Sequence, residues 1–578
     1  MRPVAAQTQM AREPRLAAPR TIPRLWQDAV ARGWDDPAYL VQEGDKWREV
    51  SWSEAARSVD ELAHGLLALG IGKGDAFAIL ASTRLEWALF DFALAIVGAV
   101  GAPIYANSAA SEVAHVLEHS EAVGILCEDD AQRAKLGDAA PRHVLTFGDL
   151  DELRERGREH AKVHPHAVEN AAAAIDPDDL FTFLYTSGTT GPTKGCMIRH
   201  RNYYAMAAKI DGLDDFVVAG DVMLLWLPLA HNFGRLMHLS GPYAGYTVAF
   251  CPDPYAVADA LMAVRPTVFP SAPRVYEKVH GAVTAAFAEA SGPKRRLVEW
   301  ALRTGRETSA RTQRQEPLPA SLRLRHALAD RLVYRKVKRR LGGRIRICIS
   351  GGAPLAPEIA SLFHSLDVLI LEGYGLSECT TAATVNRPTR FRFGTVGPAL
   401  PGVELRIADD GEVLVRSDTV FAGYYKDEAA TREALDGDGW LHTGDVGELD
   451  EDGFLRITDR KKDILITSGG KNVAPQKLEN ELKTSPLVSQ ALVVGDRRPY
   501  VVALITLDPD VSRDGVDEKI QALVDEVNRD LSRFEQIKRF AILPRDFSAE
   551  KDEVTPTLKL KRRVCEQHFA AEIDALYA

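Results

Sequence analysis

Residues 185–195 carry the strongest local signal in the sequence, Tyr185-Thr-Ser-Gly-Thr-Thr-Gly-Pro-Thr-Lys-Gly195. They follow directly on the apolar run Phe181-Thr-Phe-Leu. Small and hydroxylic residues with three glycines let a loop fold closely around phosphates, to which it offers backbone N–H groups, hydroxyls and one lysine charge. The motif is not a Walker A loop, because Thr193 stands where that motif requires its second glycine. We therefore predict a nucleotide phosphate loop at the end of a buried strand.

Regular structure around this loop is predicted by the pattern of apolar residues. From about residue 75 to residue 350, short apolar runs alternate with longer helical patterns, and the runs begin at Ala76, Val123, Phe181, Met223, Thr247 and Ile345. Continuous apolar strands separated by helices indicate parallel sheets that are covered on both faces. Residues 92–106 form a longer apolar stretch, but two glycines and Pro103 interrupt it, which favours a buried helix and strand over a membrane anchor.

The pattern changes after residue 400. Residues 403–407 and 412–416 alternate polar with apolar around Asp409-Asp410-Gly411, which predicts a hairpin in an antiparallel sheet with one solvated face. From about residue 460, a helical pattern at 476–484 precedes strand-like runs near residues 491 and 501. That order is typical of a small α+β domain.

Composition removes several classes of protein. The 578 residues are 46% apolar and 26% charged, close to the averages for globular proteins, which excludes disordered, collagenous and coiled-coil chains. A net charge of −10 does not suit a duplex nucleic-acid binder. Six cysteines without a C-x-x-C pair fit a reducing, cytoplasmic location. Residues 1–24 carry five arginines but lack the apolar stretch of a secretory signal, so we interpret them as a loose leader.

One segment has a charge opposite to that of the whole chain. Residues 294–344 contain 16 Lys or Arg and four acids, a local excess of +12 that leaves −22 for the remainder of the chain. The segment belongs to a predicted basic helical region at about 285–344, interrupted at Pro317-Leu-Pro319. Its charges lie either on solvated helix faces or on a patch that attracts an anionic substrate, CoA or a membrane surface.

Three further fragments contain groups that suit a nucleotide. Glu372-Gly-Tyr-Gly-Leu-Ser-Glu378 follows another apolar run, at the strand end where open α/β sheets bind ligands. Its tyrosine can stack on a purine, and its second glutamate can hold Mg²⁺ through a hard oxygen. Trp440-Leu-His-Thr-Gly-Asp445 and Asp459-Arg-Lys-Lys-Asp463 offer a carboxylate for ribose hydroxyls and an arginine for ribose or phosphate. Read singly, each fragment also fits an ordinary turn.

Taken together and in this order, these motifs resemble the adenylate-forming superfamily, which includes acyl-CoA synthetases, firefly luciferase and the adenylation domains of nonribosomal peptide synthetases. The similarity runs from about residue 50 to the C-terminus. It implies an α/β fold with a large N-terminal domain, residues 25–459, made of helix-flanked β-sheets plus a small distorted barrel. A small mobile α+β C-terminal domain, residues 460–578, follows. The resemblance implies an active site between the two domains.

The resemblance also implies a role for each matching residue. Lys462 is expected to be the hinge between the domains. Lys559 is expected to contact the acyl and phosphate oxygens during adenylation. We prefer Lys559 to Lys561 because the family has an arginine three residues after this lysine, and Arg562 occupies that position relative to Lys559. Thr186 and Glu378 are expected near Mg²⁺. The loop formed by Ser468, Gly469, Gly470 and Lys471 is expected to approach the thiol channel after the C-terminal domain rotates. The nucleotide-binding residues implied are Thr186, Ser187, Gly188, Thr189, Thr190 and Lys194 for the phosphates, Gly351, Gly352, Ala353, Pro354, Glu372, Gly373, Tyr374 and Gly375 around adenine, and Asp445 with Arg460 for ribose.

Narrower features are similar to the long-chain fatty acyl-CoA synthetase branch, notably Leu227-Pro-Leu-Ala-His-Asn-Phe-Gly-Arg235 and Thr555-Pro-Thr-Leu-Lys-Leu-Lys-Arg562. His231 is expected beside the acyl carboxylate, the alternative being a histidine satisfied within the core. The branch usually has an acidic residue at the position of Gly234, and its loss is expected to reshape the entrance of the acyl tunnel.

The resemblance therefore predicts an AMP-forming acid–thiol ligase that uses ATP, Mg²⁺ and CoA. It would activate a medium- to long-chain fatty acid as acyl-AMP with release of pyrophosphate, then transfer the acyl group to CoA with release of AMP. Two alternatives stay open. An acyl-AMP ligase would load a carrier protein, although the sixteen residues after Arg562 are too few for a fused carrier domain. A non-catalytic acyl-adenylate sensor would lack a catalytic group, yet every group named above is present. Expected partners are the acid, CoA and a membrane periphery contacted through residues 294–344, with no nucleic acid.

Overall fold

Two mainly parallel sheets form the body of the protein. The computed structural model describes residues 20–186, 193–214, 216–509, 511–529, 531–548, 551, 553–555 and 560–578. One sheet has the strand order β6-β5-β3-β4-β7-β8 and is parallel except where β7 meets β8. The other has the order β14-β13-β12-β11-β9-β10-β1-β2 and is antiparallel only at its two edges. The prediction of parallel sheets is confirmed.

The strands of both sheets are short and mostly buried. The first sheet contains β3 (Ala76–Ala81), β4 (Val100–Tyr105), β5 (Gly124–Cys127), β6 (His143–Thr146), β7 (Leu180–Thr186) and β8 (Lys194–Arg199). The second contains β1 (Tyr39–Glu43), β2 (Lys46–Val50), β9 (Val222–Leu225), β10 (Thr247–Phe250), β11 (Val268–Ser271), β12 (Ile347–Ser350), β13 (Ile370–Tyr374) and β14 (Thr384–Val385).

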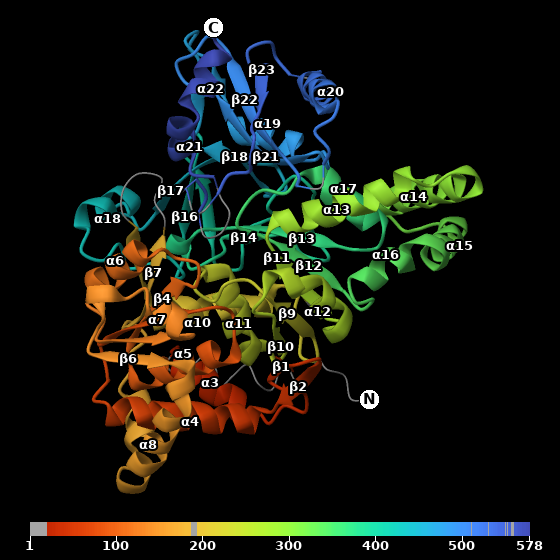
Figure 1. Cartoon of the computed structure of the whole chain (residues 1–578). Coiled ribbons are helices and arrows are strands. Elements are labelled where there is room, and N and C mark those ends of the chain that lie inside the picture. The colour runs from red at the N-terminus through yellow and green to blue at the C-terminus, as the bar shows by residue number, and fades with distance from the viewer. Residues whose placement is uncertain are drawn as a thin grey trace.

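Helices cover these sheets because each connection between parallel strands must cross a sheet face (Figure 1). The helix α5 (Leu85–Val97) is apolar on nearly all sides and is accordingly buried, as predicted for this stretch. It ends at Gly98, whose φ of 79° is the left-handed conformation that glycine adopts most easily at a helix end. The other helices of the body are α3 (Ile22–Ala31), α4 (Trp52–Ala68), α6 (Ala110–Ser120), α7 (Asp130–Arg133), α8 (Leu150–Val163), α9 (Ala167–Ala173), α10 (His200–Ala208), α11 (Asn232–Ala244), α12 (Val257–Val264) and α17 (Pro357–Ser365).

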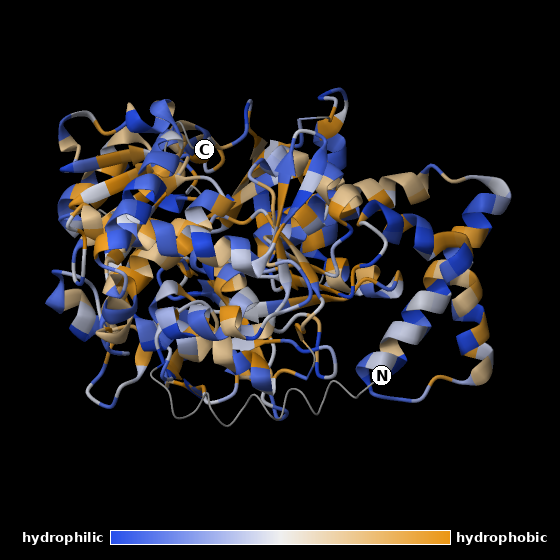
Figure 2. Cartoon of the chain, turned by 90° about the horizontal axis from the view of Figure 1, so that it is seen from below, coloured by the Kyte–Doolittle hydropathy of each residue, from blue (hydrophilic) through white to orange (hydrophobic). Residues whose placement is uncertain are grey.

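A helical arm projects from one side of the body (Figure 1). It contains α14 (Gly292–Gln313), α15 (Ala320–Ala329), the π-helical turn η5 (Asp330–Tyr334) and α16 (Arg335–Arg340), and α13 (Pro273–Ala288) leads into it. Residues 314–319 are not helical, so the break predicted at the two prolines separates α14 from α15. The arm carries hydrophilic and hydrophobic residues side by side (Figure 2).

A smaller antiparallel sheet follows the body, with the strand order β15-β16-β17-β18. The predicted hairpin is present, because β15 (Glu404–Ile407) pairs with β16 (Glu412–Arg416) in a register that sets Leu405 opposite Val415. The sheet is completed by β17 (Leu441–Leu449) and β18 (Leu455–Arg460), with α18 (Glu428–Ala434) beside it. It supplies one residue of β17 and the last residue of β18 to the candidate site below.

The C-terminal part has its own sheet and its own core at the top of Figure 1. Its three-stranded sheet contains β21 (Val488–Val494), β22 (Val501–Leu507) and β23 (Ile537–Ile542), and β19 (Leu465–Ile466) pairs with β20 (Asn472–Val473). The helices are α19 (Pro475–Leu482), α20 (Val516–Asn528), α21 (Arg562–His568) and α22 (Ala570–Ala575). The predicted α/β class, with a small α+β unit at the C-terminal end, is confirmed.

Within the described ranges, no helix combines the length and the apolar character needed to cross a bilayer. All six cysteines are buried and none forms a disulfide.

A buried ion pair connects α11 to α5, and a hydrogen bond from the same arginine connects it to β7. Arg235 is 0% exposed, and its guanidinium binds both carboxylate oxygens of Asp91 on α5, with the Nε to Oδ2 distance at 3.0 Å. Its remaining nitrogen donates to the Thr182 hydroxyl on β7 at 2.7 Å. The guanidinium also lies 4.4 Å from the ring centroid of Phe181. Arg235 therefore links α11 to α5 and to β7, two elements that are distant from it in the sequence.

Two buried histidines predict how stability depends on pH. Burial lowers the pKa of His200 and that of His238 to about 3, far below their usual 6.5. The unfolded chain therefore binds protons near pH 6.5 that the folded chain does not, so acidification below that pH should destabilise the fold by up to about 1.4 kcal/mol per pH unit and per histidine. The measurement is the free energy of unfolding in urea between pH 7.5 and pH 5.

The control for this prediction is His238→Gln, which removes one titrating group. His238 faces the hydroxyl of Tyr39 at 3.2 Å, a contact that a glutamine amide can keep. The variant should lose less stability on acidification than the wild type does. Identical pH slopes for the two proteins would show that His238 protonates as readily in the fold as in the unfolded chain.

Candidate active site

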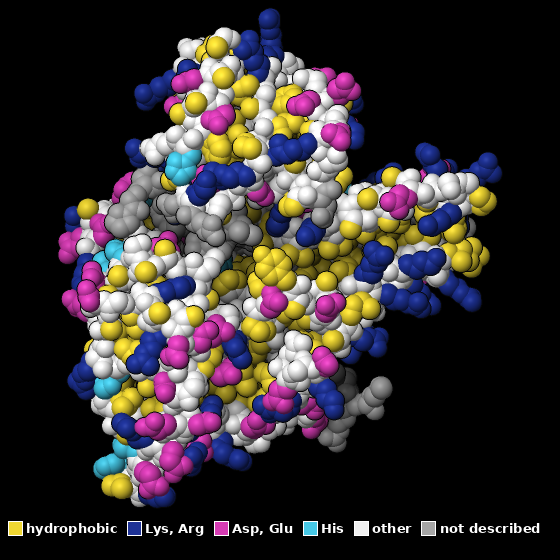
Figure 3. Space-filling model, viewed as in Figure 1, with side chains coloured by type: hydrophobic (Ala, Val, Ile, Leu, Met, Phe, Trp, Pro, Cys, Tyr) yellow, Lys and Arg dark blue, Asp and Glu magenta, His cyan; other side chains and the backbone are white. Residues whose placement is uncertain are grey.

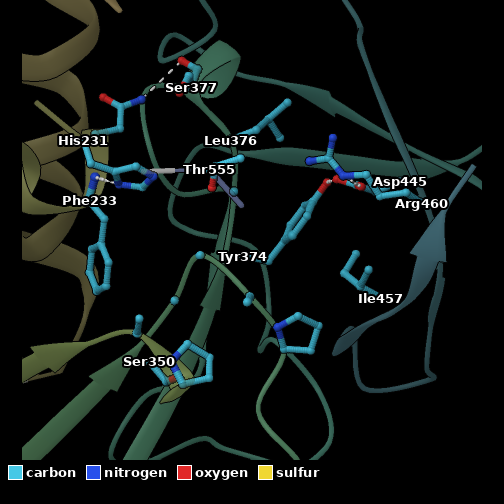
Figure 4. A pocket seen from close by; sticks show the side chains of 18 of the residues that line it. His231, Phe233, Ser350, Tyr374, Leu376, Ser377, Asp445, Ile457, Arg460 and Thr555 are labelled. Carbon is cyan, nitrogen blue, oxygen red and sulfur yellow. Dashed lines mark hydrogen bonds and ion pairs between the residues drawn. The ribbon is translucent and has the colours of Figure 1, made fainter. Parts of the chain in front are cut away.

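Three side chains meet here, from the last residue of β13, the middle of β17 and the last residue of β18 (Figure 4). The hydroxyl of Tyr374 donates to Asp445 at 2.7 Å, and Arg460 Nε lies 3.0 Å from the other oxygen of the same carboxylate. Residues 445 and 460 are directly opposed in the β17–β18 ladder, which places the arginine beside the aspartate. Burial raises the pKa of Tyr374 well above its usual range, so its hydroxyl stays protonated and remains a donor. The structure thus brings together three residues predicted to bind adenosine.

The predicted adenine loop, Gly351-Gly352-Ala353-Pro354, follows directly on β12 and lines the same cavity as this group. Glu372 supports the loop, because its carboxyl accepts a hydrogen bond from the Leu355 backbone N–H at 3.1 Å. Burial raises the pKa of Glu372 to about 8, and its second oxygen has no hydrogen-bond partner among the described residues. Gly375 has no room for a side chain, since a Cβ there would lie 1.9 Å from the carbonyl oxygen of Thr381.

The two ends of the predicted phosphate loop lie together. Thr186 at the end of β7 opposes Lys194 at the start of β8, while Ser187, Gly188, Thr189 and Thr190 lie outside the described residues. Lys194 Nζ is 3.1 Å from Asp427 and 5.2 Å from the ring centroid of Tyr424. These contacts hold the lysine charge at the rim of the cavity.

Thr186 and Glu378 are neighbours of one buried thiol. Burial raises the pKa of Cys196 well above its usual range, the Glu378 carboxylate adds to this, and a hydrogen bond with Thr186 opposes it. Glu378 also accepts a hydrogen bond from the Tyr424 hydroxyl at 2.7 Å. The two residues predicted to lie near Mg²⁺ are therefore on the same side of the cavity.

His231 lines the cavity from the start of α11. It is the N-cap residue of that helix, and its Nδ1 accepts a hydrogen bond from the Phe233 backbone N–H at 3.1 Å. Its ring faces the same cavity as Tyr374, Asp445 and Arg460 (Figure 4). The histidine is half-buried, so it is not enclosed in the core.

The structure explains why residue 234 is a glycine. A Cβ at this position would lie 2.3 Å from the carbonyl oxygen of Pro228 and 2.8 Å from that of Leu227. The loop before α11 therefore packs directly on the first turn of the helix, and this backbone arrangement excludes the acidic side chain that the branch usually carries.

The cavity is large enough for several substrates at once, with a volume of about 3630 Å³. Beyond His231 it continues between α10, α11 and β9 along an apolar wall formed by Met206, Ile210, Leu213, Phe216, Met237 and Tyr246. In the opposite direction it reaches the C-terminal part, where Thr555, Leu560 and Lys561 line it.

The remaining predicted residues belong to the C-terminal part of the chain. Lys559 lies outside the described residues, although Val554 and Leu560 on either side of it form an antiparallel bridge. Lys462 is exposed in the turn after β18. In the predicted thiol-channel loop, Ser468, Gly469, Gly470 and Lys471 are all exposed, and Ser468 also lines the cavity. Lys471 Nζ lies 5.9 Å from the ring centroid of Phe534.

Sequence reasoning missed Tyr424 and Asp427. Both contact predicted site residues, Tyr424 through the Glu378 carboxylate and Asp427 through the Lys194 ammonium. The signal that could have found them is Gly423-Tyr-Tyr-Lys-Asp427, an aromatic pair after a glycine in a stretch without helical or strand periodicity.

Family comparisons agree with this arrangement. Residues 26–425 match the AMP-binding enzymes, and residues 462–578 match the AMP-binding enzyme C-terminal domain. The chain therefore belongs to the AMP-binding enzyme family, and the predicted adenylate-forming superfamily is confirmed.

Comparison with individual proteins indicates to which branch of this family the chain belongs. The chain is 41% identical to the "Long-chain-fatty-acid--CoA ligase FadD15" of Mycobacterium bovis, over 94% of this chain and 95% of that protein. It is 31% identical to the "Long chain acyl-CoA synthetase 7, peroxisomal" of Arabidopsis thaliana, over 92% and 82%. The prediction of the long-chain fatty acyl-CoA synthetase branch is confirmed.

Solved structures share the fold. The adenylation domain of a carboxylate reductase from Mycobacterium chelonae superposes with a TM-score of 0.77 at 24% identity, covering 96% of this chain and 91% of that one. An anthranilate CoA ligase in complex with anthranoyl-AMP superposes with a TM-score of 0.74 at 21% identity, covering 96% and 98%.

Proposed function

We propose that this protein is an ATP-dependent fatty acyl-CoA ligase. ATP and the fatty acid react first, because a carboxylate oxygen attacks the α-phosphorus and the bond to pyrophosphate breaks. The thiol of CoA then attacks the acyl carbon of the adenylate, and the bond to AMP breaks. The observation that carries the proposal is one cavity that joins Asp445, Tyr374 and Arg460 to His231 and to an apolar extension. The protein is an AMP-forming acid–thiol ligase by family, with ATP, Mg²⁺ and CoA as cofactor and substrates.

The nucleotide is proposed to bind between the ends of β12 and β13 and the middle of β17. Asp445 accepts hydrogen bonds from the ribose hydroxyls, for which its buried, oriented carboxylate is suited. Arg460 holds that carboxylate in place and adds a positive charge near the phosphates. Tyr374 and the loop 351–354 enclose the adenine.

The phosphate side of the cavity offers ligands that fit Mg²⁺. Glu378 supplies a carboxylate and Thr186 a hydroxyl, which are the hard oxygen ligands this ion prefers. When bound, Mg²⁺ supplies charge stabilisation for phosphoryl oxygens. The Lys194 charge and the loop N–H groups orient the β- and γ-phosphates.

The acyl substrate is proposed to lie with its carboxylate at His231 and its chain along the apolar wall. A wall rich in Met, Ile, Leu and Phe favours a medium- to long-chain acid, because each buried methylene of the acyl chain contributes about 0.8 kcal/mol.

We propose two roles for the C-terminal domain, residues 460–578. Lys559 stabilises the charge that develops during adenylation. Rotation about Lys462 then withdraws Lys559 and brings the loop from Ser468 to Lys471 toward the thiol channel. The turn at Lys462 is a suitable hinge, since the Lys462 side chain is exposed and has no place in a hydrophobic core.

The function is tested by measuring pyrophosphate release over carboxylic acids of graded chain length, followed by analysis of the acyl product. The expected results are pyrophosphate release with medium- to long-chain acids and acyl-CoA formation with CoA as acceptor. The alternative is an acyl-AMP ligase that loads a carrier protein. Acyl transfer to a phosphopantetheinylated carrier without any acyl-CoA would replace our proposal with that one.

We further propose that the enzyme is cytoplasmic and reaches the membrane only at its periphery, through the basic segment 294–344. Its net charge, opposite to that of the remainder of the chain, supports this proposal.

Replacing Glu378 with glutamine should raise the Mg²⁺ concentration needed for half-maximal adenylation by on the order of tenfold, because one charged ligand is lost. Pyrophosphate release across a Mg²⁺ titration measures the effect. The matched control is Tyr424→Phe, which keeps the carboxylate and removes only its 2.7 Å hydrogen bond. An unchanged Mg²⁺ dependence in the glutamine variant would remove Glu378 from the metal site.

A further inference from the structure

The outer face of the arm carries an unusual row of leucines. Leu324, Leu328 and Leu332 are 74%, 50% and 37% exposed. They are four residues apart, so they lie along one side of α15 and the turn η5. The buried residues of the same elements are Leu322, Ala329, Val333 and Tyr334. The three leucines are therefore not part of the buried side of α15 and η5 that packs within the arm.

Cations surround this row. Residues 323–340 contain eight Lys or Arg and a single acid, Asp330. That acid is neutralised by Arg335 at 2.9 Å and by Lys338 at 2.6 Å. Five other cations of the segment are exposed and form no ion pair among the described residues: Arg323, Arg331, Lys336, Arg339 and Arg340. Figure 3 shows Lys and Arg side chains along the arm with hydrophobic side chains between them.

We propose that this leucine row docks the arm on the surface of an anionic lipid bilayer. Leucines that reach the boundary between headgroups and acyl chains lose contact with water, while the flanking Arg and Lys bind headgroup phosphates. The excess of +12 in residues 294–344, against −22 elsewhere, orients the molecule with the arm toward the membrane. The inference rests on the proposed function, because a fatty acid dissolved in a bilayer is the substrate that such docking would serve.

Charge also argues against a second copy of the chain as the occupant of this surface. Two arms packed face to face would bring two strongly cationic surfaces together, which is unfavourable. The row is one side chain wide and spans about 12 Å of helix, whereas a stable protein interface buries about 800 Å² on each partner. A planar anionic surface satisfies the cations and the leucines together.

The test is co-sedimentation of the full chain with vesicles, using the variant Leu324→Ser/Leu328→Ser/Leu332→Ser. The matched control is Val163→Ser/Met262→Ser/Leu449→Ser, which removes three apolar side chains of nearly the same exposure, 71%, 53% and 37%, from other surfaces. The wild type and the control should bind vesicles that contain phosphatidylglycerol, and not vesicles of phosphatidylcholine alone. The leucine variant should bind the anionic vesicles at least tenfold more weakly.

Charge reversal gives a second, independent comparison. The variant Arg323→Glu/Arg331→Glu/Arg339→Glu should lose vesicle binding, and high salt should weaken the wild type. The control Arg133→Glu/Lys162→Glu/Arg432→Glu reverses three exposed charges elsewhere and should bind like the wild type. Equal binding to neutral and anionic vesicles, or full binding by the leucine variant, would overturn the proposal. A wild-type dimer that the leucine variant converts to monomer in light scattering would overturn it as well.

Enzyme assays separate this inference from the proposed function. With fatty acid supplied in anionic vesicles, the leucine variant should form acyl-CoA several-fold more slowly than the control does. With fatty acid supplied on albumin, the two should be equal. Vesicle binding without any ligase activity in the wild type would contradict the proposed function and leave the docking surface supported.

Discussion

Replacing Lys559 with alanine should lower the rate of acyl-adenylate formation by on the order of 10³-fold, because one positive charge would be lost from a step in which negative charge builds on phosphoryl oxygens. Transfer of a supplied acyl-adenylate to CoA should stay within about threefold of the wild-type rate, since that step does not use this charge. Pyrophosphate release measures the first half-reaction, and acyl-CoA formation from synthetic adenylate measures the second.

The neighbouring lysine provides the control. Lys561 is two residues away in the sequence and lines the cavity, so Lys561→Ala removes an equal charge from the same segment of the chain. We expect that variant to keep most of its adenylation activity. If Lys561→Ala loses most of its adenylation activity and Lys559→Ala loses little, the catalytic lysine is Lys561 and not Lys559. Equal losses of both half-reactions in Lys559→Ala would reject a role confined to adenylation.

Breaking the buried pair between Asp91 and Arg235 should destabilise the protein by about 3–5 kcal/mol, because either single replacement leaves a charge buried without its partner. Arg235→Met and Asp91→Leu are the single variants. The free energy of unfolding in urea, followed by tryptophan fluorescence, measures the loss. Trp87 is a suitable reporter, since its ring centroid lies 5.5 Å from the guanidinium.

The double variant Asp91→Leu/Arg235→Met distinguishes a charge effect from a packing effect. With both charges absent, most of the lost stability should return, because no buried charge remains unpaired. Additive destabilisation in the double variant would show that packing, not the ion pair, determines the cost. Activity should follow stability, since Arg235 anchors α11 four residues after His231.

Much of the fold could be predicted because its signals are local. The apolar runs that became β3, β5, β7, β9, β10 and β12 needed only their own residues and the helical spacing between them. The hairpin of β15 and β16 was equally local, with a turn at Gly411, whose φ of 85° favours glycine. The predicted nucleotide groups Tyr374, Asp445 and Arg460 also met, although 71 residues separate the first two.

Contacts between distant residues were beyond local reasoning. Arg235 binds Asp91, which is 144 positions away, and the sequence around either residue does not predict this pairing. Glu378 and Tyr424 are 46 positions apart, and the tyrosine lies in a stretch without periodicity. Gly234 similarly reads as a missing side chain in the sequence, whereas the structure shows two backbone carbonyls filling that place.

The sequence by itself determined the order of strands and helices, the positions of the nucleotide motifs and the local excess of positive charge, because each depends on residues close together in the chain. Tertiary structure alone decided which leucines of the arm are covered. Leu322 is buried and Leu324, two residues later, is 74% exposed, since the packing of α15 on α14 selects one side of the helix. When a helix has apolar residues on two sides, its sequence does not predict which side will be buried against another element. That choice is what turns a basic segment into a candidate membrane surface.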